Sequence, residues 1–318
     1  MSIRPLSRQV SVRWLAAAAL AVTLGRAAAA PAREQPANAR RVLFEGVTYV
    51  REVRRTPRPL VLHALIVDLR TRGLSFVVTP EGPVPGGRVR ARTTSRFLAE
   101  YGVQAAINAS NFTWGPPEKE RPAGPGLGGP VSPDGVWASG GHVFTRGEDP
   151  QWPPVYLSRD NRVQFGAPRG PIYSATAGKG PMLTHGAATV GSAPVNHALH
   201  PRTAIAIDRT GRRLILLVVD GRQPGYSEGV TVAELAEIAR GFGAYTGVNL
   251  DGGGSSAMVV EGEDGRPVQL NSPIDGGVPG TERPVATHIG LRARPLRGAN
   301  RAPRSPLPTS RGVELHGT

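Results

Sequence analysis

The stretch "TVAELAEIARGFGAYTGVNLDGGGSS" (residues 231–256) holds a helix signal, a strand signal and three consecutive glycines in direct succession. Thr231 and Glu234 have the spacing of a capping box, and Gly243 is a suitable helix end. One face of this helix is apolar: Val232, Leu235, Ala236, Ala239 and Phe242. The run "TGVNL" then predicts a strand that ends beside Asp251 and the glycines. These signals predict a helix and a strand that bring a carboxylate and a pliable backbone to one strand end.

The residues after Asp251 allow two interpretations. They are Gly252, Gly253, Gly254, Ser255 and Ser256. In one interpretation they form a tight hairpin turn, for which Asp-Gly is a common signal. In the other, successive N–H groups and the two hydroxyls form a concave site for an anion. No helix follows, so the stretch is not a dinucleotide-binding fingerprint. In an anion site, Asp251 would need a separate role as acid or base, as metal ligand or as partner of an arginine.

An earlier segment, "TTSRFLAEYGVQAAINASNF" (residues 93–112), repeats the order of capped helix, glycine, strand and asparagine. Asn108 here and Asn249 in the later segment occupy matching places. We expect both strand ends to reach one cleft, where Asn108, Asn111 and Asn249 suit the hydroxyl groups of a sugar. The alternative for Asn108 and Asn111 is an Asx turn or a structural hydrogen bond.

The remaining sequence is rich in strand and turn signals. Glycine (41 residues) and proline (31) are abundant without a repeat period, which indicates many turns rather than a helical bundle. Further strands are predicted at 42–53, 60–69, 74–79, 103–108, 155–157, 162–165, 203–208, 213–220, 256–261 and 283–292. Residues 115–141 are expected to form one long Gly/Pro-rich loop, either a lid over a site or a solvated excursion. The sequence predicts an α+β fold of strand-rich mixed sheets with a few short helices.

The N-terminus has the features of a secretory signal peptide. A basic region is followed by an apolar run at 14–24 and by the small residues Ala27–Ala30. The run is shorter than the about 20 apolar residues that span a bilayer, and a retained membrane anchor is the alternative. We expect a signal peptide at 1–30, a linker at 31–40, a single catalytic domain at 41–293 and a disordered basic tail at 294–318.

Composition excludes some classes of function and weakens another. The chain has no cysteine, which excludes disulfides, cysteine-ligated metals and a cysteine nucleophile. Its net charge is +14, yet the basic residues are spread along the chain, and no nucleic-acid motif accompanies them. A nucleic-acid partner is therefore not expected.

Three further segments place charged residues beside strands. In "VVDGRQPGYSEGV" (residues 218–230) a strand ends at Asp220, and Arg222 follows, where its forked guanidinium could bind two phosphate oxygens. The alternative is a local Asp220–Arg222 turn pair. "HPRTAIAID" (200–208) places Arg202 before a strand, and "GKGPMLTHG" (178–186) places Lys179 between glycines. His200 is a weaker candidate, because a lone histidine is more often structural.

Taken in order, these segments and "RPVATHIGL" (residues 283–291) resemble the phosphodiester glycosidase family over roughly residues 42–292. The most specific pieces are "NLDGGGSS" (249–256) and the pair "RTAIAID" (202–208) and "VVDGR" (218–222). The resemblance implies an α+β domain that cleaves a sugar from a sugar-1-phosphodiester. It leaves the identity of the sugar open.

A working hypothesis follows for the site. Arg202, Arg222 and Lys179 hold the phosphate, and Asp251 or Asp220 acts as base or stabilises positive charge at the anomeric carbon. The residues expected to contact the substrate besides these are Asn108, Asn111, Asn249, Gly252, Gly253, Gly254, Ser255 and Ser256. No cofactor is expected, although Asp251 could ligate a divalent cation.

We expect a secreted or periplasmic hydrolase whose partner is a carbohydrate or glycosyl-phosphate substrate, for example an envelope glycan or exopolysaccharide. No stable membrane insertion is expected after signal cleavage, and the sequence does not indicate an oligomeric state. Two alternatives remain: a non-catalytic carbohydrate-binding envelope protein, and a glycan hydrolase that acts on linkages without phosphate.

Overall fold

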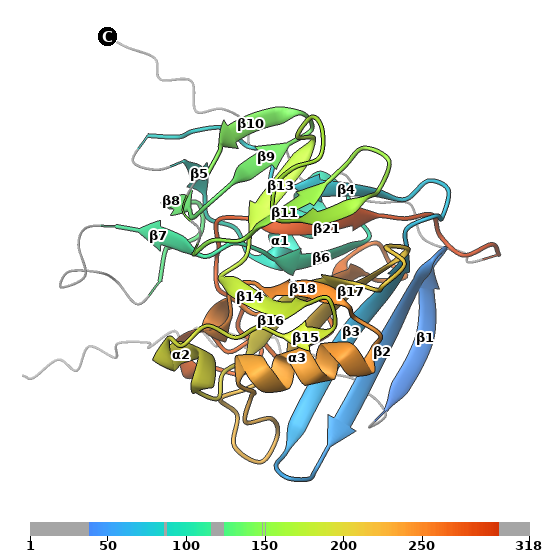
Figure 1. The fold of residues 1–318 in the computed structure, drawn as a ribbon, viewed down its shortest axis with the longest axis vertical. Coiled ribbons are helices and arrows are strands. Elements are labelled where there is room, and N and C mark those ends of the chain that lie inside the picture. The colour runs from blue at the N-terminus through green and yellow to red at the C-terminus, as the bar shows by residue number, and fades with distance from the viewer. Residues whose placement is uncertain (1–37, 86–87, 116–123, 148, 150, 299–318) are drawn as a thin grey trace, which may run out of the picture. The chain divides into compact units, whose positions relative to one another are not determined.

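The computed structural model describes residues 38–85, 88–115, 124–147, 149 and 151–298 (Figure 1). The predicted signal peptide lies outside these residues, as do most of the linker and most of the basic tail. The first strand begins at Ala39, two residues before the predicted start of the domain.

The largest sheet has eight strands in the order β1-β2-β3-β17-β16-β18-β14-β15. Its strands are β1 (Ala39–Phe44), β2 (Val47–Arg54), β3 (Leu60–Asp68), β14 (Gly180–Thr184), β15 (Ala187–Ala188), β16 (Arg202–Ile207), β17 (Arg213–Val219) and β18 (Thr246–Asn249). The long strands β3, β16 and β17 are apolar runs and are buried almost throughout, as expected for central strands.

A five-stranded sheet has the order β20-β19-β6-β21-β4. Its strands are β4 (Ser75–Val78), β6 (Ala105–Asn108), β19 (Met258–Glu261), β20 (Pro267–Gln269) and β21 (His288–Arg292). Strand β18 in the large sheet and β19 in this one follow each other in the chain. The segment between them, residues 250–257, therefore joins the two sheets.

Two smaller sheets complete the described strands. One has the order β10-β9-β13-β11-β12, and the other has the order β5-β8-β7. Their strands are β5 (Val89–Arg90), β7 (Phe112–Trp114), β8 (Pro130–Pro133), β9 (Trp137–Ser139), β10 (His142–Thr145), β11 (Pro154–Leu157), β12 (Val163–Phe165) and β13 (Ser174–Ala177).

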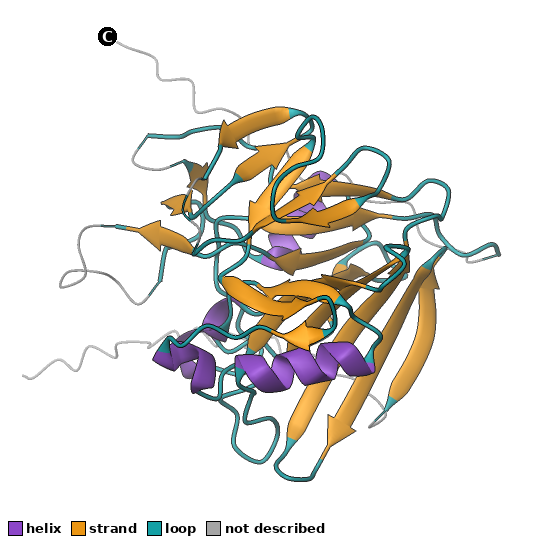
Figure 2. Ribbon diagram, in the orientation of Figure 1, coloured by secondary structure: helices purple, strands orange, loops and turns teal. Residues whose placement is uncertain are grey.

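Helices are few and short across the described residues, as Figure 2 shows in purple. They are α1 (Thr94–Tyr101), α2 (Pro194–His197) and α3 (Val232–Gly241), with short 3-10 turns η2 (Gly253–Ser255) and η3 (Asp275–Gly277). The predicted capping box of α3 is confirmed, since the Thr231 side chain accepts from the Glu234 amide and Glu234 accepts from the Thr231 amide. The predicted start and end of α1 are also confirmed, with Thr93 as N-cap and Gly102 in the left-handed region.

The hydrophobic core lies between the sheets and under the helices. Its main cluster combines buried side chains of the large sheet, such as Phe44 and Tyr49, with Ile107 of β6 and Trp137 of β9. A second cluster joins the apolar face of α3 to strands β3, β14, β16 and β17. Figure 1 shows α3 lying along the strands β14, β15 and β16. The core thus fixes the strand ends from which the polar residues of the site emerge.

Three sequence predictions need correction. The predicted sheets were mixed, but every strand pair in the four sheets is antiparallel. The expected single strand at 42–53 is a hairpin, because Gly46 adopts a φ of 72° between β1 and β2. The expected loop at 115–141 contains β8 and β9, whose short runs were hidden among prolines and glycines.

The capping box gives a direct test of how much α3 depends on its first turn. We predict that Thr231→Ala lowers the free energy of unfolding by about 1 kcal/mol, because the Glu234 amide loses its acceptor. Urea unfolding followed by circular dichroism measures the change. Ser192→Ala, at an exposed position outside any helix, is the matched control. Equal stability of the two variants would contradict the role given to the cap.

Candidate active site

A cavity of about 230 Å³ lies where the ends of several strands meet. It is lined by Asn111, Phe112, Trp114, Lys179, Val195, His200, Arg202, Arg222, Asp251, Gly252, Gly253, Gly254, Ser255 and Arg283. These residues come from the end of β18, the start of β16, the turn after β17, strand β7 and the loop before β14. The two segments that appeared as echoes in the sequence, at 108–112 and 249–255, do reach the same place.

Two of the three glycines make room for guanidinium groups. A Cβ on Gly253 would lie 3.1 Å from an Arg222 nitrogen, and a Cβ on Gly254 would lie 2.6 Å from an Arg283 nitrogen. Gly253 also has a φ of 62°, which disfavours any side chain. A Cβ on Gly252 would lie 2.8 Å from the Pro201 carbonyl oxygen. Gly253 and Gly254 therefore leave space for the guanidinium groups of Arg222 and Arg283, and Gly252 leaves space for the Pro201 carbonyl.

The predicted nest of free amides is wrong for most of this segment. The Gly253 N–H donates to the Pro201 carbonyl, and the Ser255 and Ser256 N–H groups donate back to Gly252 and Gly253. The Gly252 N–H donates to the Asp251 carboxylate. These amides hold the turn together, so cationic side chains rather than backbone amides make the pocket positive. The Ser255 hydroxyl is different: it is 2% exposed, lines the cavity and has no hydrogen-bond partner among the described residues.

Asp251 lies in the cavity wall with 7% of its surface exposed. Its Oδ1 accepts from Lys179 Nζ at 3.3 Å and from the Gly252 N–H at 3.0 Å. Its backbone N–H donates to the Ala109 carbonyl, and its carbonyl accepts from Asn108. The carboxylate is thus rigidly placed, while Oδ2 has no hydrogen-bond partner within the described part of the chain.

Arg202 is a fixed positive charge in the cavity wall. It is 2% exposed, and its guanidinium donates to the carbonyls of Val230, Val195 and Ala198. Burial, reinforced by the charge of Arg222, lowers the pKa of Arg202 to about 10. Carbonyls satisfy its donors without cancelling its charge, so its field acts on whatever enters the cavity.

Arg222 has a left-handed backbone conformation, and its guanidinium contacts the His200 ring. Its φ is 58°, a strained value for a residue with a side chain, and such strain often marks a functional position. Its guanidinium nitrogens lie 3.2 and 3.4 Å from His200 Nδ1. Burial and the neighbouring Arg283 lower the pKa of Arg222. Burial lowers the pKa of His200 too, with help from Arg222, Arg202 and Lys179.

The cavity therefore carries more positive than negative charge. Lys179 is paired with Asp251, and Arg283 is paired with Asp275 at 2.6 Å. Arg202 and Arg222 have no carboxylate partner in the described ranges of the chain. Burial and a neighbouring guanidinium lower the pKa of each, although the Asp251 carboxylate acts on Arg222 in the opposite direction, and the remaining excess of positive charge would favour an anion.

Three of the predicted contact residues lie outside the cavity wall, behind it. Asn108 is fully buried, donates to the Asp251 carbonyl and accepts from Thr203 and from the Ala257 amide. It clamps the end of β6 to the strand end that carries Asp251. Asn249 and Ser256 are buried and do not line the cavity. For Asn108 the alternative of a structural hydrogen bond fits the geometry better than a contact with sugar.

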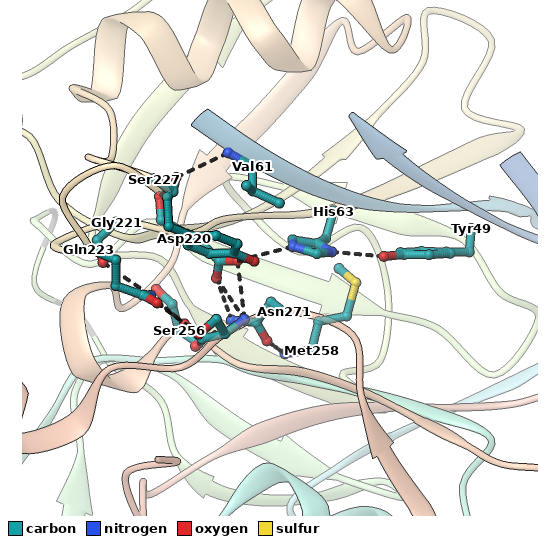
Figure 3. A network of polar contacts seen from close by, with 12 residues as sticks. Tyr49, Val61, His63, Asp220, Gly221, Gln223, Ser227, Ser256, Met258 and Asn271 are labelled. Atoms are coloured by element: carbon teal, nitrogen blue, oxygen red, sulfur yellow. Dashed lines mark hydrogen bonds and ion pairs between the residues drawn. The ribbon is translucent and has the colours of Figure 1, made fainter. Parts of the chain in front are cut away.

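Asp220 also lies away from the cavity wall, at the centre of a buried polar network (Figure 3). One carboxylate oxygen lies 3.1 Å from His63 Nε2 and accepts from the Tyr226 hydroxyl, and the other accepts from Asn271 and from the Ser272 amide. His63 is in turn hydrogen-bonded to Tyr49 Oη at 2.8 Å. With 1% of its surface exposed and its oxygens occupied by the protein, Asp220 is placed to hold the Arg222 turn rather than to touch a substrate.

The structure also adds residues that the sequence did not single out. No role was predicted for Arg283, Phe112 or Trp114, and all three line the cavity. Asn111 donates to Asp134 Oδ2 at 2.5 Å, which brings a second carboxylate close to the cavity. Asp134 follows a strand as Asp220 and Asp251 do. This position after a strand could have identified Asp134 as a candidate site residue, but the surrounding prolines and glycines made the strand hard to predict.

Among the described residues, no group of three or more His, Asp or Glu side chains is placed to hold a metal ion. A search of the same residues for a helix that is long and apolar enough to cross a membrane finds none.

Comparison with known proteins gives one family. The model of the phosphodiester glycosidase family matches residues 101–292, which is more than half of the chain. This range contains all of the residues that line the cavity. Among curated protein sequences, none matches the chain at a significant level.

Solved structures share the fold at low sequence identity. The catalytic domain of zebrafish N-acetylglucosamine-1-phosphodiester α-N-acetylglucosaminidase, auto-inhibited by its pro-peptide, superposes with a TM-score of 0.55 at 19% identity, over 82% of this chain and 85% of that one. A Burkholderia pseudomallei K96243 protein described as exported gives 0.52 at 16% identity, over 74% of each chain. A hypothetical protein from Synechocystis gives 0.52 at 15% identity, over 82% of this chain and 64% of its own length.

The buried network makes Asp220 a stability determinant. We predict that Asp220→Asn lowers the free energy of unfolding by about 3 kcal/mol, because the amide NH₂ would replace one carboxylate oxygen and face either the Tyr226 hydroxyl or the Asn271 and Ser272 donors. Asp264→Asn, at an exposed carboxylate, is the control and should change stability by less than about 0.5 kcal/mol. Chemical unfolding of both variants measures the difference. Similar stabilities would show that the network does not hold the turn.

Proposed function

The chain belongs to the phosphodiester glycosidase family, and on that premise we propose that it hydrolyses the bond between a sugar and phosphate in a sugar-1-phosphodiester. Water replaces the phosphate at the anomeric carbon, and the products are the free sugar and a phosphomonoester. We propose further that the protein is exported and acts on an envelope glycan or exopolysaccharide. The apolar N-terminal run in the sequence supports export, and the fold shared with a Burkholderia protein described as exported is compatible with it.

The observation that carries the proposal is the charge of the cavity. Arg202 and Arg222, which lack carboxylate partners among the described residues, face the same cavity as the single lining carboxylate, Asp251. A neutral glycan would gain nothing from this concentration of positive charge. A phosphodiester carries the anion that the charge requires, attached directly to the carbon at which a carboxylate can assist.

Each group then has a distinct role. Arg222 is the forked donor to the phosphate, and Arg202 and Arg283 add fixed positive charge, which stabilises the phosphate as it leaves. Lys179 links the phosphate region to Asp251, since its ammonium already contacts Asp251 Oδ1. The free Oδ2 of Asp251 stabilises the oxocarbenium-like charge at the anomeric carbon. We assign no step to a metal ion.

The remaining lining residues suit the sugar. Asn111 and the unpartnered Ser255 hydroxyl offer hydrogen bonds to sugar hydroxyls. Phe112 and Trp114, whose ring centroids lie 5.4 Å apart, add an aromatic surface for the apolar face of a pyranose. The alternatives of a carbohydrate-binding protein without catalysis and of a hydrolase for unphosphorylated glycans differ from this proposal in measurable ways.

The first test is direct assay of the purified mature protein. We expect it to release free sugar from methyl phosphodiesters of hexose 1-phosphates, and we expect Asp251→Asn to lower kcat by roughly 100-fold or more while the protein stays folded. Release of reducing sugar measures the rate, and circular dichroism checks the fold. A folded Asp251→Asn variant with the wild-type rate would remove Asp251 from the mechanism. An inactive wild-type protein that still binds glycans would favour the binding-protein alternative.

The second test separates phosphate recognition from general glycosidase activity. We expect Arg222→Ala to lower kcat/KM for the phosphodiester by roughly 10- to 100-fold, equivalent to the loss of about 1.5–3 kcal/mol of charged hydrogen bonding. A 4-nitrophenyl glycoside of the same sugar should be affected far less, because it carries no phosphate. Arg266→Ala, at an exposed arginine, is the control. Equal losses on both substrates would argue against a phosphate role for Arg222.

A further inference from the structure

A second carboxylate, Asp134, lies beside the cavity and is tied to a residue of its wall. Asp134 follows β8, which pairs with β7 so that Pro133 lies opposite Phe112. The Asp134 N–H donates to the Asn111 carbonyl at 2.9 Å, and the Asn111 side chain donates back to Asp134 Oδ2 at 2.5 Å. Two hydrogen bonds in opposite directions fix the carboxylate relative to Asn111, which lines the cavity.

The charges around Asp134 come from the same site. Burial raises the pKa of Asp134, and the negative charges of Asp251 and Asp149 raise it further, while Asn111 and Lys179 lower it. Asp251 and Lys179 both line the cavity, so charged groups of the cavity act on the Asp134 carboxylate. Its Oδ1 accepts no hydrogen bond from any residue that the structure describes. A half-buried carboxylate with one free oxygen can take up a proton.

We propose that Asp134 is the second carboxylate of the reaction and accepts a proton from the water that attacks the anomeric carbon. This inference rests on the proposed function. In the step, the water oxygen forms a bond to the anomeric carbon, and one water proton passes to the Asp134 carboxylate. The bond between the anomeric carbon and the phosphate oxygen breaks, and its electron pair leaves with the phosphate. The phosphate departs as a phosphomonoester dianion, whose charge Arg202 and Arg222 compensate.

The two carboxylates are suited to different roles because their surroundings differ. Asp251 is held in an ion pair with Lys179 and by the Gly252 amide, so that two donors already occupy its Oδ1. Asp134 has no cation within hydrogen-bonding distance among the described residues, and burial raises its pKa, which favours the uptake of a proton. A phosphate leaving group held by arginines does not require an acid to protonate it. The role that remains for a second carboxylate is therefore the activation of water.

The experiment is the pH dependence of kcat/KM for a methyl hexose phosphodiester, measured for wild-type protein and variants. A base must be deprotonated, so wild-type activity should fall at low pH, with a midpoint above the usual range for an aspartate. We expect Asp134→Asn to lower kcat/KM by roughly 10²- to 10⁴-fold and to abolish this acid limb. We expect Asn111→Ala to move the limb to higher pH, because it removes a hydrogen bond that lowers the pKa of Asp134.

Rescue by a small base gives a readout that a merely structural role would not produce. Formate should restore part of the rate of Asp134→Ala in a concentration-dependent way and should not accelerate the wild-type protein. The control is Asp160→Asn, at an exposed carboxylate paired with Arg162, which should keep both the rate and the acid limb.

The outcomes separate this inference from the proposed function. If the wild-type protein cleaves the phosphodiester but Asp134→Asn keeps the wild-type rate and limb, Asp134 is not the base and the proposed function stands. The same conclusion follows if Asp134→Asn loses activity but Asn111→Ala leaves the limb unmoved and formate restores nothing. If the wild-type protein does not cleave sugar-1-phosphodiesters at all, the proposed function itself fails.

Discussion

The buried carboxylate of Asp220 is the constraint on which the site depends. A carboxylate removed from water must have its oxygens satisfied by donors, and here those donors come from separate parts of the chain. His63 belongs to β3, Tyr226 to the turn after β17, and Asn271 to the segment after β20. Asn271 also donates to the Ser256 carbonyl, so the same network reaches the end of the glycine segment. The turn that carries Arg222 and the glycine segment against which its guanidinium lies are therefore joined to one buried centre, the network drawn in Figure 3.

A second constraint, the absence of side chains at residues 252–254, determines the chemistry of the cavity. Guanidinium groups repel one another and normally spread apart toward carboxylates or solvent. Here Arg222 and Arg283 lie on glycine backbone where a single methyl group would displace them, and Arg202 is held from behind by three carbonyls. The cost of this arrangement is seen in the lowered pKa values of Arg202 and Arg222. A phosphate bound as proposed would relieve that repulsion, whatever the identity of the sugar.

The sequence was informative where local signals decide the structure and uninformative where tertiary contacts do. Helix α3, strand β18 and the position of Asp251 follow from a capping box, an apolar face and an apolar run within one short segment. Asn111, Lys179 and Arg222 were also predicted to contact the substrate, and all three line the same cavity: Asn111 and Arg222 follow strands, and Lys179 lies between glycines. Asp220 has that position too, and only the packing of β3 against β17, which brings His63 to it, shows that its carboxylate points into a buried network. The glycine segment likewise predicted an anion site built from backbone amides. In the folded chain most of these amides donate to acceptors within the protein instead.

The arrangement of charges argues for a division of labour that a glycosidase for neutral glycans would not need. Such an enzyme commonly uses one carboxylic acid to protonate a poor leaving group and a second carboxylate at the anomeric carbon. Under the proposed function, the phosphate leaving group would lie beside Arg222 and its neighbours, and these cations would replace the carboxylic acid. One carboxylate, Asp251, is paired with a cation and fixed, and the other, Asp134, is unpaired and has a raised pKa. On the proposed function, recognition of phosphate and activation of water by the second carboxylate would both follow from the same placement of positive charge.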